Sequence, residues 1–185
     1  MIKDSGQKLF DMIIVWKLAR FARNRYDSAR YKAALKKNGV KVAIEPHGTF
    51  SLTGDGLERI MALGDPSVLG INYDACNIFR ASYVESGNGQ FGYKSNDKGE
   101  NEVKVLEGIV DRVVHCHVKD INESRQCVAV GEGIVNTKGV VETLTKNGYN
   151  GVISVETEGG GEFDDIVTLA KRSYDYLNSL RVCGK

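Results

Sequence analysis

The segment KVAIEPHG, residues 41–48, places two side chains capable of acid–base or metal chemistry directly after an apolar run. Residues 42–44 predict a short buried strand, and Glu45 and His47 follow it. Residues two apart on an extended chain point the same way, so the carboxylate and the imidazole share one side. A carboxylate at the end of a buried strand is costly unless a cation or a metal neutralises it or a loop exposes it to water. This segment alone does not distinguish the three cases.

Three later apolar runs also end in polar side chains of this kind. They are Asp74 with Asn77, then His115, His117, Lys119 and Asp120, and finally Glu156 and Glu158. The carboxyl ends of parallel strands lie on one face of an α/β fold, in open sheets and in barrels alike. We therefore expect one ligand from each run to meet at a single point: Glu45, Asp74, His117 and Glu156. Three carboxylates and one imidazole predict a divalent ion such as Mn²⁺, Mg²⁺ or Co²⁺, with Zn²⁺ also compatible.

Each of these residues also has an ordinary structural interpretation. Asp74 can cap a helix that begins near residue 77, and His115 can be a satisfied core histidine. Lys119 can contact substrate oxygens or can be a surface residue paired with Asp120. A lone glutamate after a strand is usually solvated or caps the next helix. The presence of a ligand type at all four strand ends nevertheless favours the metal-site interpretation.

Alternating strands and helices are predicted to position these residues. Residues 7–37 carry apolar side chains at helical spacing, which predicts a leading helix within residues 1–39, ended by Asn38-Gly39. Strands are predicted at 40–44, 67–74, 112–120 and 151–158, and helices at 53–65, 101–111, 136–150 and 163–180. The strands are short and rich in Val and Ile, which is typical of parallel strands buried on both faces.

These repeats predict an α/β fold with one domain over residues 1–185, of which residues 40–185 form four strand–helix units. Residues 84–101, rich in Gly, Asn and Ser, predict a loop or a partly disordered excursion. The segment VGEGIVN is the nearest candidate for a phosphate-binding loop. It lacks Gly-x-Gly-x-x-Gly spacing and does not follow a strand directly, so a flavodoxin-like phosphate binder is disfavoured.

The composition is that of an ordinary globular chain: 185 residues, 42% hydrophobic and 26% charged, with a net charge of +1. No basic field predicts nucleic-acid binding, and no polybasic patch predicts a membrane surface. The early apolar run is too short and too charged to span a bilayer. The four cysteines, Cys76, Cys116, Cys127 and Cys183, form no Cys-x-x-Cys pair, and no secretory signal is found, so we expect reduced thiols in a cytoplasmic protein.

Five phrases resemble the carboxyl-terminal half of the xylose isomerase-like TIM barrels, the sugar phosphate isomerase/epimerase family. They are VAIEPHG, GINYDACN, RVVHCHVKD, VGEGIVN and GYNGVISVETEG, and they occur in the family's order over residues 40–160. The resemblance implies a half to partial (β/α)8 barrel. It also implies that the predicted ligand set binds one divalent metal and that Glu45 and Glu156 form the acid/base pair.

The resemblance further implies a metal-dependent sugar, sugar phosphate or polyol isomerase or epimerase. One glutamate would remove a proton next to the metal-bound carbonyl, and the enediolate would be reprotonated on the neighbouring carbon or on the opposite face. His47, Asn77, His115 and Lys119 are the candidate contacts to a small sugar substrate. Asn77 stands where many members have histidine, so it can hydrogen-bond a hydroxyl but cannot act as an imidazole base.

Other functions remain open within the same resemblance. An inosose dehydratase-like lyase would use the same metal and proton abstraction and then expel a hydroxyl. The DNA-repair branch, with its trinuclear zinc cluster, is disfavoured because the chain has only three histidines. A full barrel needs about 250 residues, so the first half of the barrel is expected to be missing. We therefore also consider a non-catalytic half-barrel acting as an assembly or binding module, and we expect a homo-oligomer.

Overall fold

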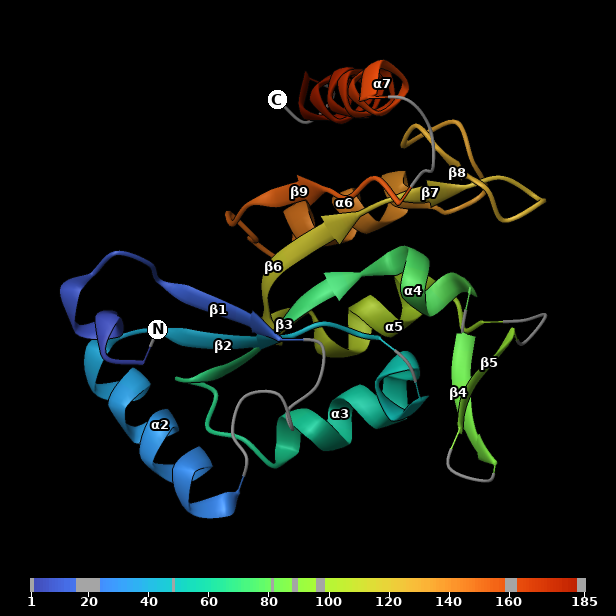
Figure 1. The fold of residues 1–185 in the computed structure, drawn as a ribbon. Helices are drawn as coiled ribbons and strands as arrows, with labels where there is room; N and C mark the ends of the chain where they lie inside the picture. The colour runs from blue at the N-terminus through green and yellow to red at the C-terminus, as the bar shows by residue number, and fades with distance from the viewer. Residues whose placement is uncertain are drawn as a thin grey trace.

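A computed structural model describes residues 2–15, 24–47, 49–80, 82–87, 90–95, 99–158 and 163–182. Its centre is a five-stranded sheet in the order β1-β2-β3-β6-β9. These strands are Met12–Val15, Lys41–Ile44, Leu69–Asp74, Val113–Val118 and Ile153–Val155. Every neighbouring pair is parallel, so all carboxyl ends point toward one edge (Figure 1). The predicted fold class is confirmed: an open, partial TIM barrel.

Helices follow the strands and pack around the outside of the sheet (Figure 1). They are α2 (Arg25–Asn38), α3 (Gly54–Ala62), α4 (Ala75–Arg80), α5 (Glu102–Ile109), α6 (Thr137–Lys146) and α7 (Phe163–Val182). The short elements are the 3-10 helices η1 (Asp4–Gln7), η2 (Thr49–Leu52) and η3 (Val110–Arg112) and the strands β7 (Asp120–Ile121) and β8 (Cys127–Val128). The four predicted strand–helix units after residue 40 are therefore present.

Local sequence explains where these helices begin and end. The side chains of Thr53 and Asn136 accept hydrogen bonds from the first-turn N–H groups of α3 and α6. The predicted stop after α2 is confirmed, because the helix ends at Asn38 and Gly39 takes a left-handed conformation with φ of 74°. Gly148 has a φ of 77° just past α6, so the second Asn-Gly signal also ends its helix.

The core lies between the sheet and the helices. All six residues of β3 are buried, and Ile71 and Tyr73 are completely inaccessible to solvent. Tyr73 nevertheless satisfies its hydroxyl, which donates to the carbonyl oxygen of Glu102 at the start of α5. Burial on both faces is the property that the Val- and Ile-rich runs predict for parallel strands.

The prediction of one leading helix within residues 1–39 is wrong for its first part. Residues 12–15 form strand β1, which pairs with β2 in the register Met12↔Lys41 to Val15↔Ile44. A run of four residues rich in Ile and Val favours the extended state, whatever helical spacing its neighbours suggest. In the described part of this region, α2 at residues 25–38 is the only α-helix, η1 is a short 3-10 helix, and residues 16–23 lie outside the described residues.

The prediction of a loop at residues 84–101 is also wrong in part. Residues Ser82–Gly87 and Gln90–Ser95 form an antiparallel pair, β4 and β5, with Ser82 opposite Ser95 and Gly87 opposite Gln90. The sequence between the two strands is Asn-Gly, which is a strong hairpin signal. The Gly- and Ser-rich composition of the surrounding residues predicted a loop instead of a hairpin.

The sheet has two edges within the described residues, because β1 pairs only with β2 and β9 pairs only with β6. Three of the cysteines are free thiols, Cys76, Cys116 and Cys127, and Cys183 lies outside the described residues. Among the described helices, none has the length and apolar character needed to cross a membrane.

Candidate metal centre

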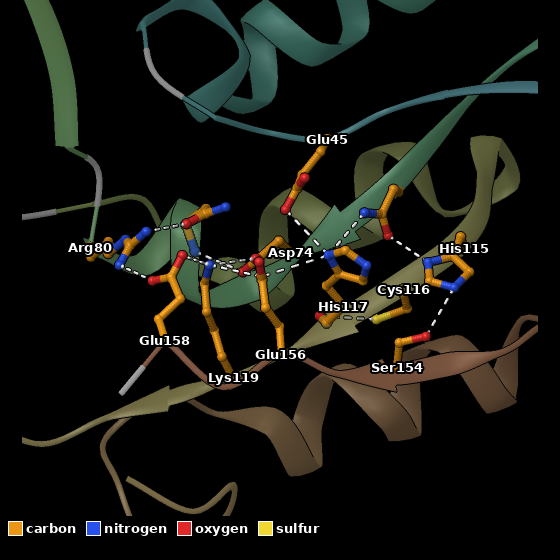
Figure 2. Close-up of polar contacts among 12 residues, drawn as sticks. Glu45, Asp74, Arg80, His115, Cys116, His117, Lys119, Ser154, Glu156 and Glu158 are labelled. Carbon is orange, nitrogen blue, oxygen red and sulfur yellow. Dashed lines mark hydrogen bonds and ion pairs between the residues drawn. The ribbon is translucent and has the colours of Figure 1, made fainter. Parts of the chain in front are cut away.

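The four side chains predicted as metal ligands lie together at the carboxyl ends of four neighbouring strands. Glu45 follows β2, Asp74 ends β3, His117 lies near the end of β6 and Glu156 follows β9. One ligand atom from each lies within 4.8 Å of the others (Figure 2). Parallel pairing brings them together, since Asp74 and His117 are register partners in the β3–β6 ladder. We call these residues the four-residue cluster.

His117 lies at the centre of this cluster. Its Nδ1 atom is 3.3 Å from Oε1 of Glu45 and 3.6 Å from Oε2 of Glu156. The hydrogen bond with Glu45 raises the pKa of His117, although burial acts in the opposite direction. Burial acts to raise the pKa of Glu45, but His117, Lys119 and His47 together outweigh it and the pKa is lowered overall. Two glutamates from different strands therefore approach the same ring nitrogen.

Asp74 caps a helix and is also a member of the four-residue cluster. Its Oδ1 accepts a hydrogen bond of 2.9 Å from the backbone N–H of Asn77, which caps α4. Its Oδ2 is buried and has no hydrogen-bond partner among the described residues, although Lys119 Nζ lies 3.1 Å away as an ion pair. Burial raises the pKa of Asp74 to about 6, and Lys119 opposes that shift. One oxygen is thus used by the fold, and the other faces the cluster.

Lys119 is enclosed rather than exposed. Its side chain is 2% exposed, and Nζ lies 3.1 Å from Asp74 Oδ2, 2.9 Å from Glu156 Oε2 and 2.9 Å from Glu158 Oε1. Burial acts to lower the pKa of Lys119, but these carboxylates raise it overall. The alternative of a surface lysine paired with Asp120 is therefore wrong, because the Asp120 carboxylate accepts from backbone N–H groups instead, among them that of Gly133.

Arg80 extends this ion-pair network toward the surface and was not predicted from the sequence. It donates to Glu158 Oε2 at 2.9 Å and to Asn77 Oδ1 at 2.8 Å. Burial acts to raise the pKa of Glu158, but Lys119 and Arg80 lower it overall. Asn77 keeps a buried Nδ2 group with no hydrogen-bond partner among the described residues. The spacing of three residues between Asn77 and Arg80 on one helix was the signal in the sequence.

A second chain of hydrogen bonds supports His117 from the other side (Figure 2). Asn72 Nδ2 lies 3.1 Å from His117 Nδ1, and Asn72 Oδ1 lies 2.8 Å from His115 Nδ1. His115 Nε2 in turn lies 3.1 Å from Ser154 Oγ. Burial lowers the pKa of His115, which favours the neutral ring. Both ring nitrogens of His115 are thus engaged, which fits the satisfied core histidine better than a substrate contact.

Asn72 was missed by the sequence reasoning, although its position carried a signal. It is a polar residue inside the apolar run LGINYD, and it is completely buried. A buried amide is costly unless it is hydrogen-bonded, so its presence marks a polar partner nearby. His47 also lies near the cluster: it contributes to lowering the pKa of Glu45, and its backbone N–H donates to Ser51 Oγ at 3.1 Å.

The residues fit a divalent cation by three observations. The donor set holds three carboxylates and one imidazole, the type of ligands that such ions bind. The buried Oδ2 of Asp74 has no hydrogen-bond partner among the described residues. With His117 neutral, the four carboxylates and two cations of this region carry a net charge of −2, which one divalent ion balances. The carboxylates are Glu45, Asp74, Glu156 and Glu158, and the cations are Lys119 and Arg80.

The fold and this arrangement define a protein class, an α/β barrel with ligand-type side chains at the carboxyl ends of its strands. Residues 22–180 match the family described as xylose isomerase-like TIM barrel. The chain belongs to the xylose isomerase-like TIM barrel family. The match extends beyond the segments that carried the sequence resemblance, since it includes α2 and most of α7.

Known proteins similar to this chain include an inosose dehydratase and an epimerase-like protein. An inosose dehydratase from Lactiplantibacillus plantarum is 27% identical over 166 residues, which cover 80% of this chain and 50% of that protein. The crystal structure of a D-tagatose 3-epimerase-like protein superposes with a TM-score of 0.68 at 20% identity, covering 100% of this chain and 68% of that one. A xylose isomerase-like TIM barrel protein from Mycobacterium smegmatis, solved with magnesium, gives 0.66 at 12% identity, covering 97% and 64%.

These comparisons differ in what they show. The structural similarities are below 25% identity and establish the fold. The chain spans about half the length of the inosose dehydratase that it matches. Activities of complete proteins in this family therefore come to this chain only as proposals.

Proposed function

We propose that this chain carries the metal centre and acid–base residues of a divalent-metal-dependent sugar, sugar phosphate or polyol isomerase or epimerase. The observation that carries the proposal is the pair of glutamates from different strands, Glu45 and Glu156, that approach one nitrogen of His117. Two carboxylates around one substrate position can remove a proton next to a carbonyl and return one. The family membership supports the same reaction class.

Glu45, Asp74, His117 and Glu156 would hold the ion, with Mn²⁺, Mg²⁺ or Co²⁺ preferred by the mainly oxygen ligands and Zn²⁺ compatible. When bound, a divalent ion supplies a Lewis acid that polarises a substrate carbonyl. The magnesium in the related Mycobacterium smegmatis protein supports a divalent ion, without identifying the metal of this chain.

Glu45 is the better placed of the two glutamates to remove a proton. The pKa of its carboxyl is lowered by His117, so the group is ionised at neutral pH, as a general base must be. Glu156 is instead tied to Lys119 at 2.9 Å. Glu45 would take the proton next to the carbonyl, and the return of a proton to the neighbouring carbon or to the opposite face would give the isomer or the epimer.

Two further side chains are suited to orient the substrate. Asn77 has a buried Nδ2 group without a hydrogen-bond partner among the described residues, and it can donate to a sugar hydroxyl. His47 lies near Glu45 and is the second candidate contact. Lys119 and His115, the other two residues predicted to contact substrate, have their polar atoms engaged by protein groups instead.

A dehydratase is the second candidate function. It is supported by the 27% identity to an inosose dehydratase, which exceeds the identity to the epimerase-like structure. The same proton abstraction by Glu45 would be followed by loss of a hydroxyl from the neighbouring carbon. The two reactions therefore share their first step and differ in the fate of the carbanion.

The test measures metal content and then proton exchange. Purified protein is loaded with Mn²⁺, and a panel of ketoses and an inosose is incubated with it in D₂O. We expect one bound ion per chain. We also expect incorporation of deuterium next to the carbonyl of the substrate, measured by NMR on protein loaded with Mg²⁺ in place of Mn²⁺. Formation of an epimer or isomer supports the first function, and loss of water from the inosose supports the second. Bound metal without exchange on any substrate would support a non-catalytic module and contradict both.

Three further expectations stay predictions. Self-association of the chain is consistent with the two sheet edges, β1 and β9, and is measured by light scattering. A cytoplasmic location is consistent with the free thiols. The net charge of +1 gives no reason to expect binding to nucleic acid.

A further inference from the structure

Asp74 and Glu156 lie between two positions: one could hold a metal ion, and the other holds the ammonium group of Lys119. On one side are His117 and Glu45, which complete the four-residue cluster (Figure 2). On the other side is Lys119, whose Nζ atom lies 3.1 Å from Asp74 Oδ2 and 2.9 Å from Glu156 Oε2. The two carboxylates thus face the cluster and the ammonium at the same time.

The Lys119 ammonium has the surroundings of a bound cation. It contacts three carboxylates: it donates hydrogen bonds to Glu156 and Glu158, each at 2.9 Å, and forms the ion pair with Asp74. The side chain of Lys119 is 2% exposed and that of Asp74 is completely buried, whereas Glu156 and Glu158 are 34% and 36% exposed. A buried carboxylate such as that of Asp74 is costly without a counter-charge, and Lys119 supplies it.

We propose that Lys119 is a built-in cation that fills a second cation position and thereby limits the centre to one divalent ion. Two-metal sites in enzymes share bridging carboxylates between ions about 3.5–4 Å apart, and Asp74 and Glu156 are placed to bridge in this way. Among the described residues, the buried Oδ2 of Asp74 has the ion pair with Lys119 but no hydrogen-bond partner, which is the independent sign that the shared carboxylates have capacity for a further cation. This inference rests on the proposed metal centre.

Charge counting agrees with one divalent ion in the wild-type chain. With Lys119 present, the network carries two negative charges and one divalent ion neutralises it. Without the lysine charge, three negative charges remain around Asp74, and a single divalent ion leaves one of them uncompensated. Two divalent ions leave one positive charge instead, so the net charge does not choose between one ion and two. The second ion is favoured by its ligands, because Asp74, Glu156 and Glu158 all keep an oxygen in the place of the ammonium.

The test compares the metal stoichiometry of the wild-type chain and of Lys119→Met, measured by titration with Mn²⁺ and by electron paramagnetic resonance. We expect one Mn²⁺ with a mononuclear spectrum in the wild type. In the variant we expect two Mn²⁺ with the signal of a spin-coupled pair. Lys36→Met is the matched control, since it removes an exposed lysine paired with Asp65 at 2.6 Å, and it should still bind one ion.

Each outcome decides the matter. A folded Lys119→Met variant that binds one ion overturns this inference but leaves the metal centre intact. Two ions in the wild type overturn the inference as well, and no ion in the wild type overturns the metal centre together with it. If Lys119→Met does not fold, Lys119→Gln purified in Mn²⁺ replaces it. If neither folds, the wild-type spectrum at saturating Mn²⁺ decides between a mononuclear and a coupled centre.

Discussion

Lys119 Nζ lies 3.1 Å from Asp74 Oδ2, and the two side chains are 2% and 0% exposed. A buried ion pair of this kind adds little net stability compared with apolar residues, yet removing one partner leaves an uncompensated buried charge. Because the buried pair adds little stability and is costly when one partner is lost, we infer that these residues serve a function beyond folding. The pair connects the ion-pair network to the proposed metal centre, since Asp74 belongs to both.

The first prediction concerns Asp74→Asn, which removes the charge but keeps the oxygen that caps α4. Because Oδ1 can still accept from the N–H of Asn77, we expect the fold to be retained. Mn²⁺ affinity should fall by more than the roughly 10–100-fold that loss of an outer-shell partner costs. Titration calorimetry checks this, with Asp65→Asn as a surface control. Unchanged affinity would show that Asp74 is not a ligand.

The second prediction concerns Glu45→Gln. If Glu45 is the general base, substrate proton exchange should fall by about 10²–10⁴-fold. Deuterium incorporation in D₂O with saturating metal measures the rate, and circular dichroism checks the fold. Glu142→Gln, in the exposed pair with Lys138, is the matched control and should keep the wild-type rate. Exchange at the wild-type rate in Glu45→Gln would assign the base elsewhere.

The position of these residues could be predicted because parallel strands share one direction. Glu45, Asp74, His117 and Glu156 were predicted because each lies at the end of an apolar run. The register of the sheet brings these four side chains together, one from each strand end. What could not be predicted is which polar partners each side chain takes. Lys119 illustrates this, because only the three-dimensional packing shows that it turns away from Asp120 and into three carboxylates.

The errors in the fold have local causes. Strand β1 was predicted as helix, because a run of four residues is too short for its periodicity to separate helix from strand. Pairing with β2 decides it, and that contact joins residues about 30 positions apart. Strands β4 and β5 were predicted as loop, because Gly and Ser depress the strand signal even where an Asn-Gly pair stands between the two strands.

The third prediction concerns Asn72, which links His115 to His117 through its amide group. Asn72→Ala frees the His117 ring from one of its contacts, so we expect Mn²⁺ affinity to fall roughly 10–100-fold. The visible absorption spectrum of the Co²⁺-loaded protein should also change, because the ring orientation affects the ligand field. Ser154→Ala, which removes the hydroxyl that lies 3.1 Å from His115 Nε2, should alter both less. An identical Co²⁺ spectrum in Asn72→Ala would contradict a positioning role.

The last prediction concerns Asp120, which lies next to Lys119 and is completely buried. Its carboxylate accepts from four backbone N–H groups at 2.9–3.0 Å, those of Ile121, Gly131, Gly133 and Val135. Asp120→Ala leaves these donors without their acceptor, at about 1–3 kcal/mol for each buried group, so we expect a loss of at least about 3 kcal/mol in the free energy of unfolding.

Urea unfolding of the metal-free protein measures this loss. Glu142→Ala on the exposed face of α6 is the control and should change the free energy of unfolding by less than about 0.5 kcal/mol. Gly133→Ala should act in the same direction as Asp120→Ala, since a Cβ atom there would collide with the Asp120 carboxylate and the carbonyl oxygen of Ile121. If Asp120→Ala unfolds at the wild-type urea concentration, the carboxylate does not hold this loop, and the position of Lys119 must be fixed by its own ion pairs.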